Sequence, residues 1–513
     1  DINSGLTRAI NHSPYLLNSL TNDKIYAIFR DRSGLIWIGT RKGITKIKFN
    51  KFNTIKPASL IESITSDAVR AVYHDEDNIL WIGTEEGLIK YNRIKQQAEL
   101  ISSADGSTGS IPANYIRVIY PDSRGLLWIG TANGGLIRYD PKTKRNKRFT
   151  FSGEDDGLTN NFIYSITEDY QGRIWIGTTK GLNCYNPATG KFNSFRSEKG
   201  KSGSLSHDII LCLYEDHQKR LWVGTYDGLN LMDPEKGKFI PFTHNPDDPY
   251  SISSNNIRSI IQDEAGFLWI GTKGGGLNRL NIREKKFTSW SVDEGLPNDV
   301  VYMALDDRKG YLWLSTNYGL ARFEKKTGEV ISYDVSDGVQ GYEFNSLAAF
   351  RANDGEMFFG GMNGLNVFYP SDITKNSYVP PICITGFRVF NELRFEGREF
   401  KNNDTIYLSH RDNFFSFEFA ALDFVNPGKN RYRYKLDGYD ENWISRDAGK
   451  RFAEYKRIEP GTYIFRVKGS NNDMVWNEEG MNIVVVISPP WYKTMLFRIA
   501  AILLVALLVW LIF

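Results

Sequence analysis

The stretch Leu127-Trp128-Ile129-Gly130-Thr131 is one copy of a motif that recurs along most of this 513-residue sequence. Its tryptophan is found at Trp37, Trp81, Trp128, Trp175, Trp222, Trp269 and Trp313, and Phe358 takes its place in an eighth, degraded copy. Successive copies are 44 to 47 residues apart. A fixed period of this size, kept over eight copies, indicates an internal repeat.

Each repeat contains four short apolar runs separated by turn residues. In the copy around Trp175, the third run is Gly181–Tyr185 and the fourth is Lys191–Phe195. Four such runs predict one antiparallel four-stranded sheet. A lone sheet of that size leaves both of its faces partly exposed to solvent, whereas a radial array of sheets buries the tryptophans between neighbouring sheets. The repeat therefore predicts a blade, and the array predicts an all-β protein built on a β-propeller.

The number of blades is left open by the motif count. One reading places a seven-bladed ring at 51–376 and makes 1–50 a blade of a preceding propeller; the other makes 1–50 the first blade of an eight-bladed ring. The last repeat lacks a fourth strand, because Pro370 follows its third. Propellers often borrow a closing strand from the other end of the array, and Leu6–Ile10 is our candidate.

Because the chain opens at Asp1 inside a repeat and stops at an apolar run, we read it as truncated at both ends.

Composition excludes several classes of function. The 63 basic and 60 acidic residues leave a net charge of only +3, so no concentrated basic face predicts a nucleic-acid partner. The three cysteines, Cys184, Cys212 and Cys383, lie in apolar strand patterns, and we interpret them as buried small hydrophobes rather than as disulfides or zinc ligands. No two of the six histidines have ligand spacing, so we expect no metal and no cofactor.

A second region begins at Pro380-Pro381. Alternating runs in 377–489 predict a small β-sandwich of about 110 residues, a size that suits an immunoglobulin-like domain. Its dense aromatics, among them Tyr432, Tyr434 and Tyr463, are interpreted as core and tyrosine-corner packing.

The final segment, 490–513, predicts a transmembrane helix. Residues Met495–Phe513 carry one charge, Arg498, and as a helix they would extend roughly 28 Å, close to the ~30 Å of a bilayer's hydrocarbon core. Trp491, Tyr492 and Lys493 would anchor this helix at the interface, and Arg498 would reach the headgroups.

The acidic residues do not indicate an enzyme. They recur at one position of the repeat just before a turn, where a carboxylate accepts local backbone N–H groups: Asp31, Asp75, Asp122, Asp169, Asp216, Asp263 and Asp307. No motif of a nucleophile, a zinc protease or a phosphate loop is present, so no catalytic residue is assigned. A propeller-fold glycoside hydrolase or polysaccharide lyase remains the alternative, since two acids from different blades can meet across the central funnel. A protein-binding scaffold is a third reading.

A ligand is expected on the loops that join strands two to three and four to one, because these loops surround the mouth of the channel and vary while their neighbours stay constant. Their Tyr, Asn, Asp, Lys and Arg side chains suit sugar hydroxyls or uronates. The candidate ligand-binding residues are Arg41, Glu85, Tyr115, Asn133, Lys180, His207, Tyr226, Asp227, Lys273, Asn317 and Tyr318.

Repeats, sandwich and apolar end together resemble the sensor region of hybrid two-component regulators of Bacteroidota and of related histidine kinases, in which regulator-propeller repeats precede a YYY domain. The matching residues are the Leu-Trp-Ile-Gly-Thr units, the variant repeat from Gly295 to Thr316, and Tyr432–Tyr439 with Glu459–Tyr463 in the sandwich. The family's paired seven-bladed rings favour seven blades here, as does Ile44–Ile64, which lacks the usual Asp-Pro linker.

The resemblance implies a non-catalytic, ligand-sensing region of a two-component sensor in the inner membrane, with residues 1–489 in the periplasm. It implies a homodimer that binds a small molecule or an oligosaccharide from polysaccharide breakdown. The signal would then cross the membrane to a cytoplasmic kinase that is absent from this chain.

Overall fold

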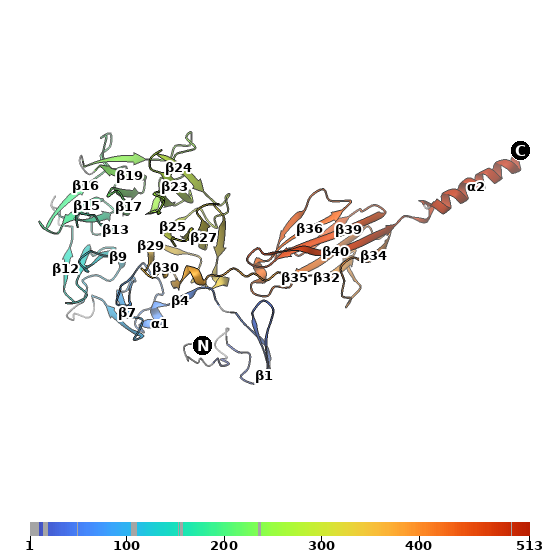
Figure 1. The fold of residues 1–513 in the computed structure, drawn as a ribbon, viewed down its shortest axis with the longest axis horizontal. Coiled ribbons are helices and arrows are strands. Elements are labelled where there is room, and N and C mark those ends of the chain that lie inside the picture. The colour runs from blue at the N-terminus through green and yellow to red at the C-terminus, as the bar shows by residue number, and fades with distance from the viewer. Residues whose placement is uncertain are drawn as a thin grey trace. The chain divides into compact units, whose positions relative to one another are not determined.

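The structure is a computed structural model that describes residues 10–13, 19–48, 50–103, 110–151, 153, 157–233, 237–493 and 495–513. These residues belong to two compact units (Figure 1). One unit is Asn50–Ile373, and the other combines Asp1–Phe49 with Thr374–Phe513. We describe each unit by itself.

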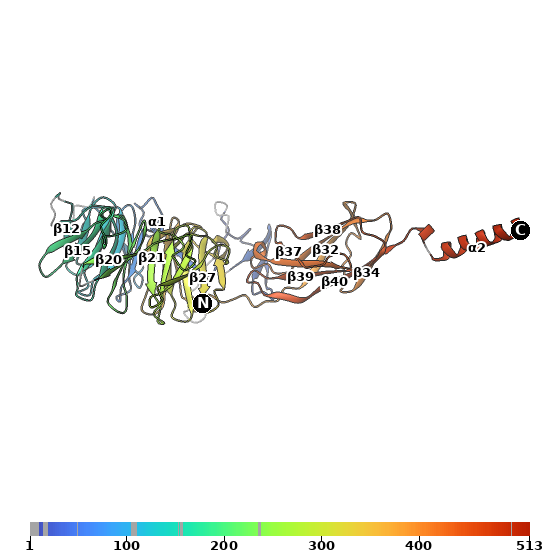
Figure 2. The same ribbon diagram turned by 90° about the horizontal axis from the view of Figure 1, so that it is seen from above.

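The described residues of Asn50–Ile373 form seven antiparallel four-stranded sheets, arranged as blades around a channel (Figures 1 and 2). The predicted seven-bladed propeller is therefore confirmed. The first three blades are β5 (Ala71–His74), β6 (Ile79–Gly83), β7 (Leu88–Asn92) and β8 (Gln97–Ile101); β9 (Ile116–Pro121), β10 (Leu127–Thr131), β11 (Leu136–Tyr139) and β12 (Asn146–Phe149); and β13 (Ile163–Glu168), β14 (Ile174–Thr178), β15 (Gly181–Asn186) and β16 (Lys191–Phe195).

The next three blades repeat this order from the channel outward. They are β17 (Ile210–Glu215), β18 (Leu221–Thr225), β19 (Gly228–Asp233) and β20 (Lys238–Phe242); β21 (Ile257–Gln262), β22 (Leu268–Thr272), β23 (Leu277–Asn281) and β24 (Lys286–Trp290); and β25 (Val301–Asp306), β26 (Tyr311–Thr316), β27 (Gly319–Glu324) and β28 (Val330–Tyr333).

The seventh blade closes the ring with a strand from the start of the unit. It consists of β29 (Phe344–Arg351), β30 (Met357–Gly361), β31 (Gly364–Phe368) and β4 (Asn53–Ile55), and β4 pairs antiparallel with β31. A borrowed closing strand was correctly expected, but its assignment to Leu6–Ile10 was wrong. Leu6 to Ala9 lie outside the described residues, and β4 fills the position because Phe52 beside it is fully buried against Tyr333 and Phe368. The short helix α1 (Pro57–Leu60) follows β4.

The glycine of each Trp-Ile-Gly-Thr unit marks where one blade meets the next. A Cβ built on Gly130 would lie 2.6 Å from Cγ2 of Ile163, the first residue of the following innermost strand. A Cβ built on Gly177 would contact Ile210 in the same way, and one built on Gly360 would contact Val69. The seventh blade therefore packs against the first through the same kind of contact that joins the other neighbouring blades. The repeat motif therefore encodes the interface between blades as well as the blade itself.

The motif copy around Trp37 does not enter this ring. It forms a three-stranded sheet, β1 (Ile25–Arg30), β2 (Ile36–Thr40) and β3 (Gly43–Ile47), which belongs to the other unit. The eight-bladed alternative is therefore wrong. The apolar side chains of Ile25, Ile28 and Phe29, whose counterparts are enclosed in the ring, are exposed here.

The predicted β-sandwich is confirmed. One sheet contains β33 (Glu392–Arg394), β32 (Ile382–Val389), β35 (Phe414–Ala421) and β38 (Phe452–Lys456); the other contains β34 (Asp404–Ser409), β40 (Trp476–Ser488), β39 (Gly461–Ser470), β36 (Arg431–Asp437) and β37 (Ile444–Asp447). The sheets enclose one core, in which Phe417 and Phe465 stack with ring centroids 4.1 Å apart. Tyr463 donates a hydrogen bond to the carbonyl of Glu459, which makes the tyrosine corner.

The transmembrane helix expected at 490–513 is not supported. The helix α2 covers Met495–Ile512, 18 residues, and Trp491–Lys493 form a separate 3-10 turn before it. Among the helices in the described part of the chain, none combines the length and the apolarity needed to cross a membrane.

Candidate ligand site at the mouth of the propeller channel

The innermost strands of the seven blades share a two-residue signature at their channel-mouth ends. A fully buried apolar residue comes first, and the next residue is Arg in three blades, Tyr in two, Leu in one and Asn in one. The variable residues are Arg70, Arg117, Tyr164, Leu211, Arg258, Tyr302 and Asn345. Five of them, together with Glu343, Phe344 and Ser346, line one cavity of about 210 Å³: Arg70, Arg117, Arg258, Tyr302 and Asn345. Side chains from five blades thus converge at one point.

Arg70 is held in place by several partners. Its Nη2 lies 2.6 Å from Oε1 of Glu85, its Nη1 donates a hydrogen bond to the side-chain oxygen of Asn345, and its guanidinium lies over the ring of Tyr115. The bond from Arg70 keeps the pKa of Glu85 below its ordinary value. Asn345 in turn donates to the carbonyl of Val69, so the first and last blades are tied together beside the cavity.

The guanidinium groups of Arg117 and Arg258 have fewer hydrogen-bond and ion-pair partners than that of Arg70. Arg117 is flanked by the rings of Phe162 and Tyr164, each 4.9 Å from its guanidinium carbon, and burial lowers the pKa of its guanidinium. Within the described part of the chain, the buried Nε atoms of both Arg117 and Arg258 have no hydrogen-bond partner, and neither residue forms an ion pair. Burial also raises the pKa of Tyr302, whose hydroxyl donates to Asn317 at 2.7 Å.

Three of the residues predicted from sequence adjoin this cavity through direct contacts. Glu85 and Tyr115 contact Arg70, and Asn317 accepts the hydrogen bond from Tyr302. These contacts bring together loops of blades one, two and six.

The other predicted residues of the propeller lie on the same set of loops but not in the cavity. Tyr226 and Tyr318 are each 52% exposed; the first packs beside His207 and the second stacks on Tyr342. Asp227 accepts a hydrogen bond from Asn255. The side chains of Asn133, Lys180 and Lys273 are exposed. They form a rim of separate side chains around the cavity.

One predicted site residue is misplaced, and five residues of the innermost runs that line the cavity were missed. Arg41 lies in the turn between β2 and β3, outside the propeller, so its assignment to the mouth was wrong. The residues that were not predicted are Arg70, Arg117, Arg258, Tyr302 and Asn345. A signal existed, because aligning the seven innermost runs shows one variable position beside a position that is always apolar. Variation is easy to recognise in the polar loops between strands. The variable position of the innermost strand is harder to recognise, because it lies within a run of apolar residues.

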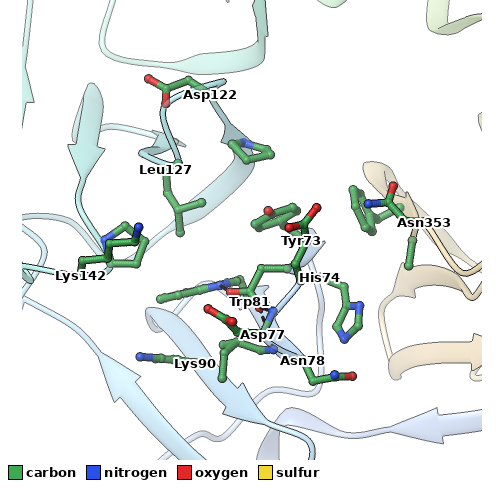
Figure 3. A pocket seen from close by; sticks show the side chains of 18 of the residues that line it. Tyr73, His74, Asp77, Asn78, Trp81, Lys90, Asp122, Leu127, Lys142 and Asn353 are labelled. Carbon is green, nitrogen blue, oxygen red and sulfur yellow. Dashed lines mark hydrogen bonds between the residues drawn. The ribbon is translucent and has the colours of Figure 1, made fainter.

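A larger hollow of about 860 Å³ opens beside the opposite ends of the innermost strands, at the loop Asp75–Asn78 (Figure 3). None of the predicted site residues lines it. Its two repeated acids already have structural partners, because Asp75 and Asp122 accept hydrogen bonds from the indoles of Trp81 and Trp128. His74 stacks on Phe358, and its buried Nε2 has no hydrogen-bond partner among the described residues. Burial lowers the pKa of His74, which favours its neutral form. Volume alone therefore does not make this hollow the better candidate site.

The repeated acids have a structural role in most blades. The expected turn bonds are present, as where Asp216 accepts the backbone N–H of Arg220 at 3.1 Å. A second bond was not predicted: the other oxygen of Asp216 accepts the indole N–H of Trp222 at 2.8 Å, and the pairs of Trp37, Trp81, Trp128, Trp175 and Trp269 repeat it. Among the residues that the structure describes, no group of three His, Cys, Asp or Glu could hold a metal ion.

The site and the fold together define a class of protein: a seven-bladed propeller with a polar channel mouth, followed by a β-sandwich. The model of the Two component regulator propeller family matches seven repeats at 19–42, 63–86, 110–133, 157–180, 204–227, 251–274 and 295–318. The Y_Y_Y domain model matches residues 423–488. The chain is therefore built from two-component regulator propeller repeats and a Y_Y_Y domain, as the sequence resemblance indicated.

Three proteins extend this result. The extracellular domain of a hybrid two component system from B. thetaiotaomicron aligns with a TM-score of 0.77 at 26% identity, over 92% of this chain and 62% of its own. The histidine kinase P4 of Formosa agariphila is 33% identical over 205 residues, which are 38% of this chain and 15% of the kinase. The chain thus spans less than two thirds of either relative. A second extracellular domain from B. thetaiotaomicron has the same fold, with a TM-score of 0.52 at 23% identity.

Proposed function

We propose that this chain is the ligand-sensing region of a two-component sensor and that its ligand is an oligosaccharide released from a polysaccharide. The observation that carries the proposal is the mouth of the channel, where Arg, Tyr and Asn side chains from five blades converge on one cavity. Hydrogen-bonding groups in a concave site, with exposed Tyr226 and Tyr318 on its rim, suit the hydroxyls and the flat faces of sugar rings.

In this proposal the region works outside the cytoplasm as a homodimer, and the signal crosses a membrane to a cytoplasmic kinase. The extracellular domain and the histidine kinase to which the chain is similar support this location and this output. A ligand shifts the equilibrium between two arrangements of a receptor only by its difference in affinity for them. Binding therefore has to favour one packing of the two protomers.

The experiment is calorimetric titration of the purified 513-residue chain with a panel of neutral and acidic oligosaccharides, followed by chromatography of each mixture. We expect at least one saccharide to bind and all to be recovered intact. Release of shorter products would favour the glycoside hydrolase or lyase alternative. Failure of the whole panel to bind would contradict saccharide sensing.

A further inference from the structure

Arg117 and Arg258 occupy the same strand position in the second and the fifth blade. In a ring of seven, two blades lie between them on one side and three on the other, so the two side chains approach the mouth cavity from opposite sides of the channel. Both line that cavity, together with Arg70 from the first blade.

The positive charges at this constriction exceed the negative ones. Glu85 pairs with Arg70, and Glu343 is the carboxylate that lines the cavity itself. Three guanidinium groups therefore face two carboxylates. Arg117 and Arg258 form no ion pair with any described residue, and each keeps a buried Nε without a hydrogen-bond partner.

Burying part of a cation without a counter-charge costs free energy, and a protein retains such an arrangement where a ligand supplies the missing charge. Guanidinium groups bind carboxylates and sulfates through paired N–H donors in a planar fork. The cavity, at about 210 Å³, is smaller than the roughly 300–1,000 Å³ of pockets that enclose a whole ligand. It has room for one charged substituent, while the rest of the ligand lies on the rim.

We propose that this cavity binds one anionic group of an acidic saccharide, a uronate carboxylate or a sulfate ester, between Arg117 and Arg258. The proposal rests on the proposed saccharide-sensing function and specifies the class of ligand. Tyr302 lines the same cavity with its hydroxyl donated to Asn317, and Arg70 contributes positive charge while it remains held by Glu85.

The test compares matched charged and neutral probes by calorimetry on the whole chain. The first pair is trigalacturonate and its methyl ester, and the second is a sulfated trisaccharide and its desulfated form. We expect the charged member of at least one pair to bind ten-fold or more tightly than its neutral partner, and the pair that responds identifies the anion. The double variant Arg117→Gln/Arg258→Gln should abolish the preference, because Gln keeps hydrogen-bonding capacity and removes the charge.

The matched control is Arg145→Gln/Arg283→Gln, which removes the same charge from exposed turns between the third and fourth strands of the same two blades. This control should keep the preference. Equal affinity for charged and neutral probes, a preference that survives in the double variant, or binding of none of the four probes would overturn the inference. Neutral oligosaccharides that bind regardless of the double variant would overturn it while leaving saccharide sensing intact.

A second measurement needs no ligand. Arg258→Met should leave the melting temperature of the unliganded chain unchanged or raise it, because it removes a charge that lacks a partner. Arg173→Met, which breaks the 2.6 Å ion pair with Asp169, should lower the melting temperature. A loss for Arg258→Met as large as that for Arg173→Met would mean that Arg258 is already satisfied within the protein, and would overturn the inference.

Discussion

At the scale of single residues, the repeated aspartate ties the turn of the first five blades to the tryptophan of the same blade. Asp216 is fully buried and bonds to Trp222 and to Arg220, whereas the sixth blade differs because the indole N–H of Trp313 has no partner in the described structure. We expect Asp216→Ala to cost about 2–3 kcal/mol and Asp307→Ala about 1 kcal/mol, since only the first substitution breaks bonds between side chains. Urea unfolding followed by fluorescence measures both, and equal losses would contradict this role.

The three cysteines give a second prediction. Burial raises the pKa of Cys184 to about 11 and that of Cys212 to about 12, and it also raises the pKa of Cys383. A raised pKa lowers the fraction of reactive thiolate at neutral pH. Iodoacetamide at pH 8 should therefore label none of the three thiols in the folded chain and all of them in urea, as mass spectrometry would show. Cys383 is only half-buried, so the burial of Cys184 and Cys212 is what rapid labelling of these two thiols in the native protein would contradict.

At the scale of elements, the contact between blades depends on the glycine of the motif. A Cβ on Gly130 would lie 2.5 Å from Val118 and 2.6 Å from Ile163, so Gly130→Ala should cost about 1–3 kcal/mol through overpacking. Gly39 is the matched control, because it has the same place in the motif but its Cβ would meet only Ala27, at 3.7 Å. Thermal unfolding should show a marked loss for Gly130→Ala and little change for Gly39→Ala. Equal losses of stability would mean that the glycine is needed for the conformation of its own strand and not for packing between neighbouring blades.

Elements set by residues close together in the chain could be predicted from the sequence, whereas contacts between distant residues could not. The blades, the sandwich and the turn role of Asp216 followed from local patterns, because each depends on residues close together in the chain. The closing strand did not, since Asn53–Ile55 is three residues long and its partner β31 lies more than 300 residues away. Arg117 and Arg258 were missed for the same physical reason: each reads as an ordinary strand residue until the ring brings five blades to one cavity.

At the scale of the whole molecule, the sandwich leads directly into the final helix. The strand β40 ends at Ser488, and Pro489-Pro490 precede the turn at Trp491–Lys493 and the helix α2. Adjacent prolines restrict the backbone, and we propose that this stiff joint transmits a change in protomer packing. Replacing Pro489-Pro490 with Gly-Ser should leave ligand affinity nearly unchanged and abolish induction of target genes in cells whose sensor carries this region. Normal induction would show that the joint does not transmit the signal.

In the proposed function, the ligand binds at the channel mouth. Hydrogen–deuterium exchange, with and without the tightest-binding saccharide of the panel, tests it most directly because the two ends of the channel give separate peptides. We predict slower exchange in the loops at Glu85, Tyr115 and Asn317, and unchanged exchange at Asp75–Asn78 beside the larger hollow. Protection confined to Asp75–Asn78, or to the sandwich, would contradict the account.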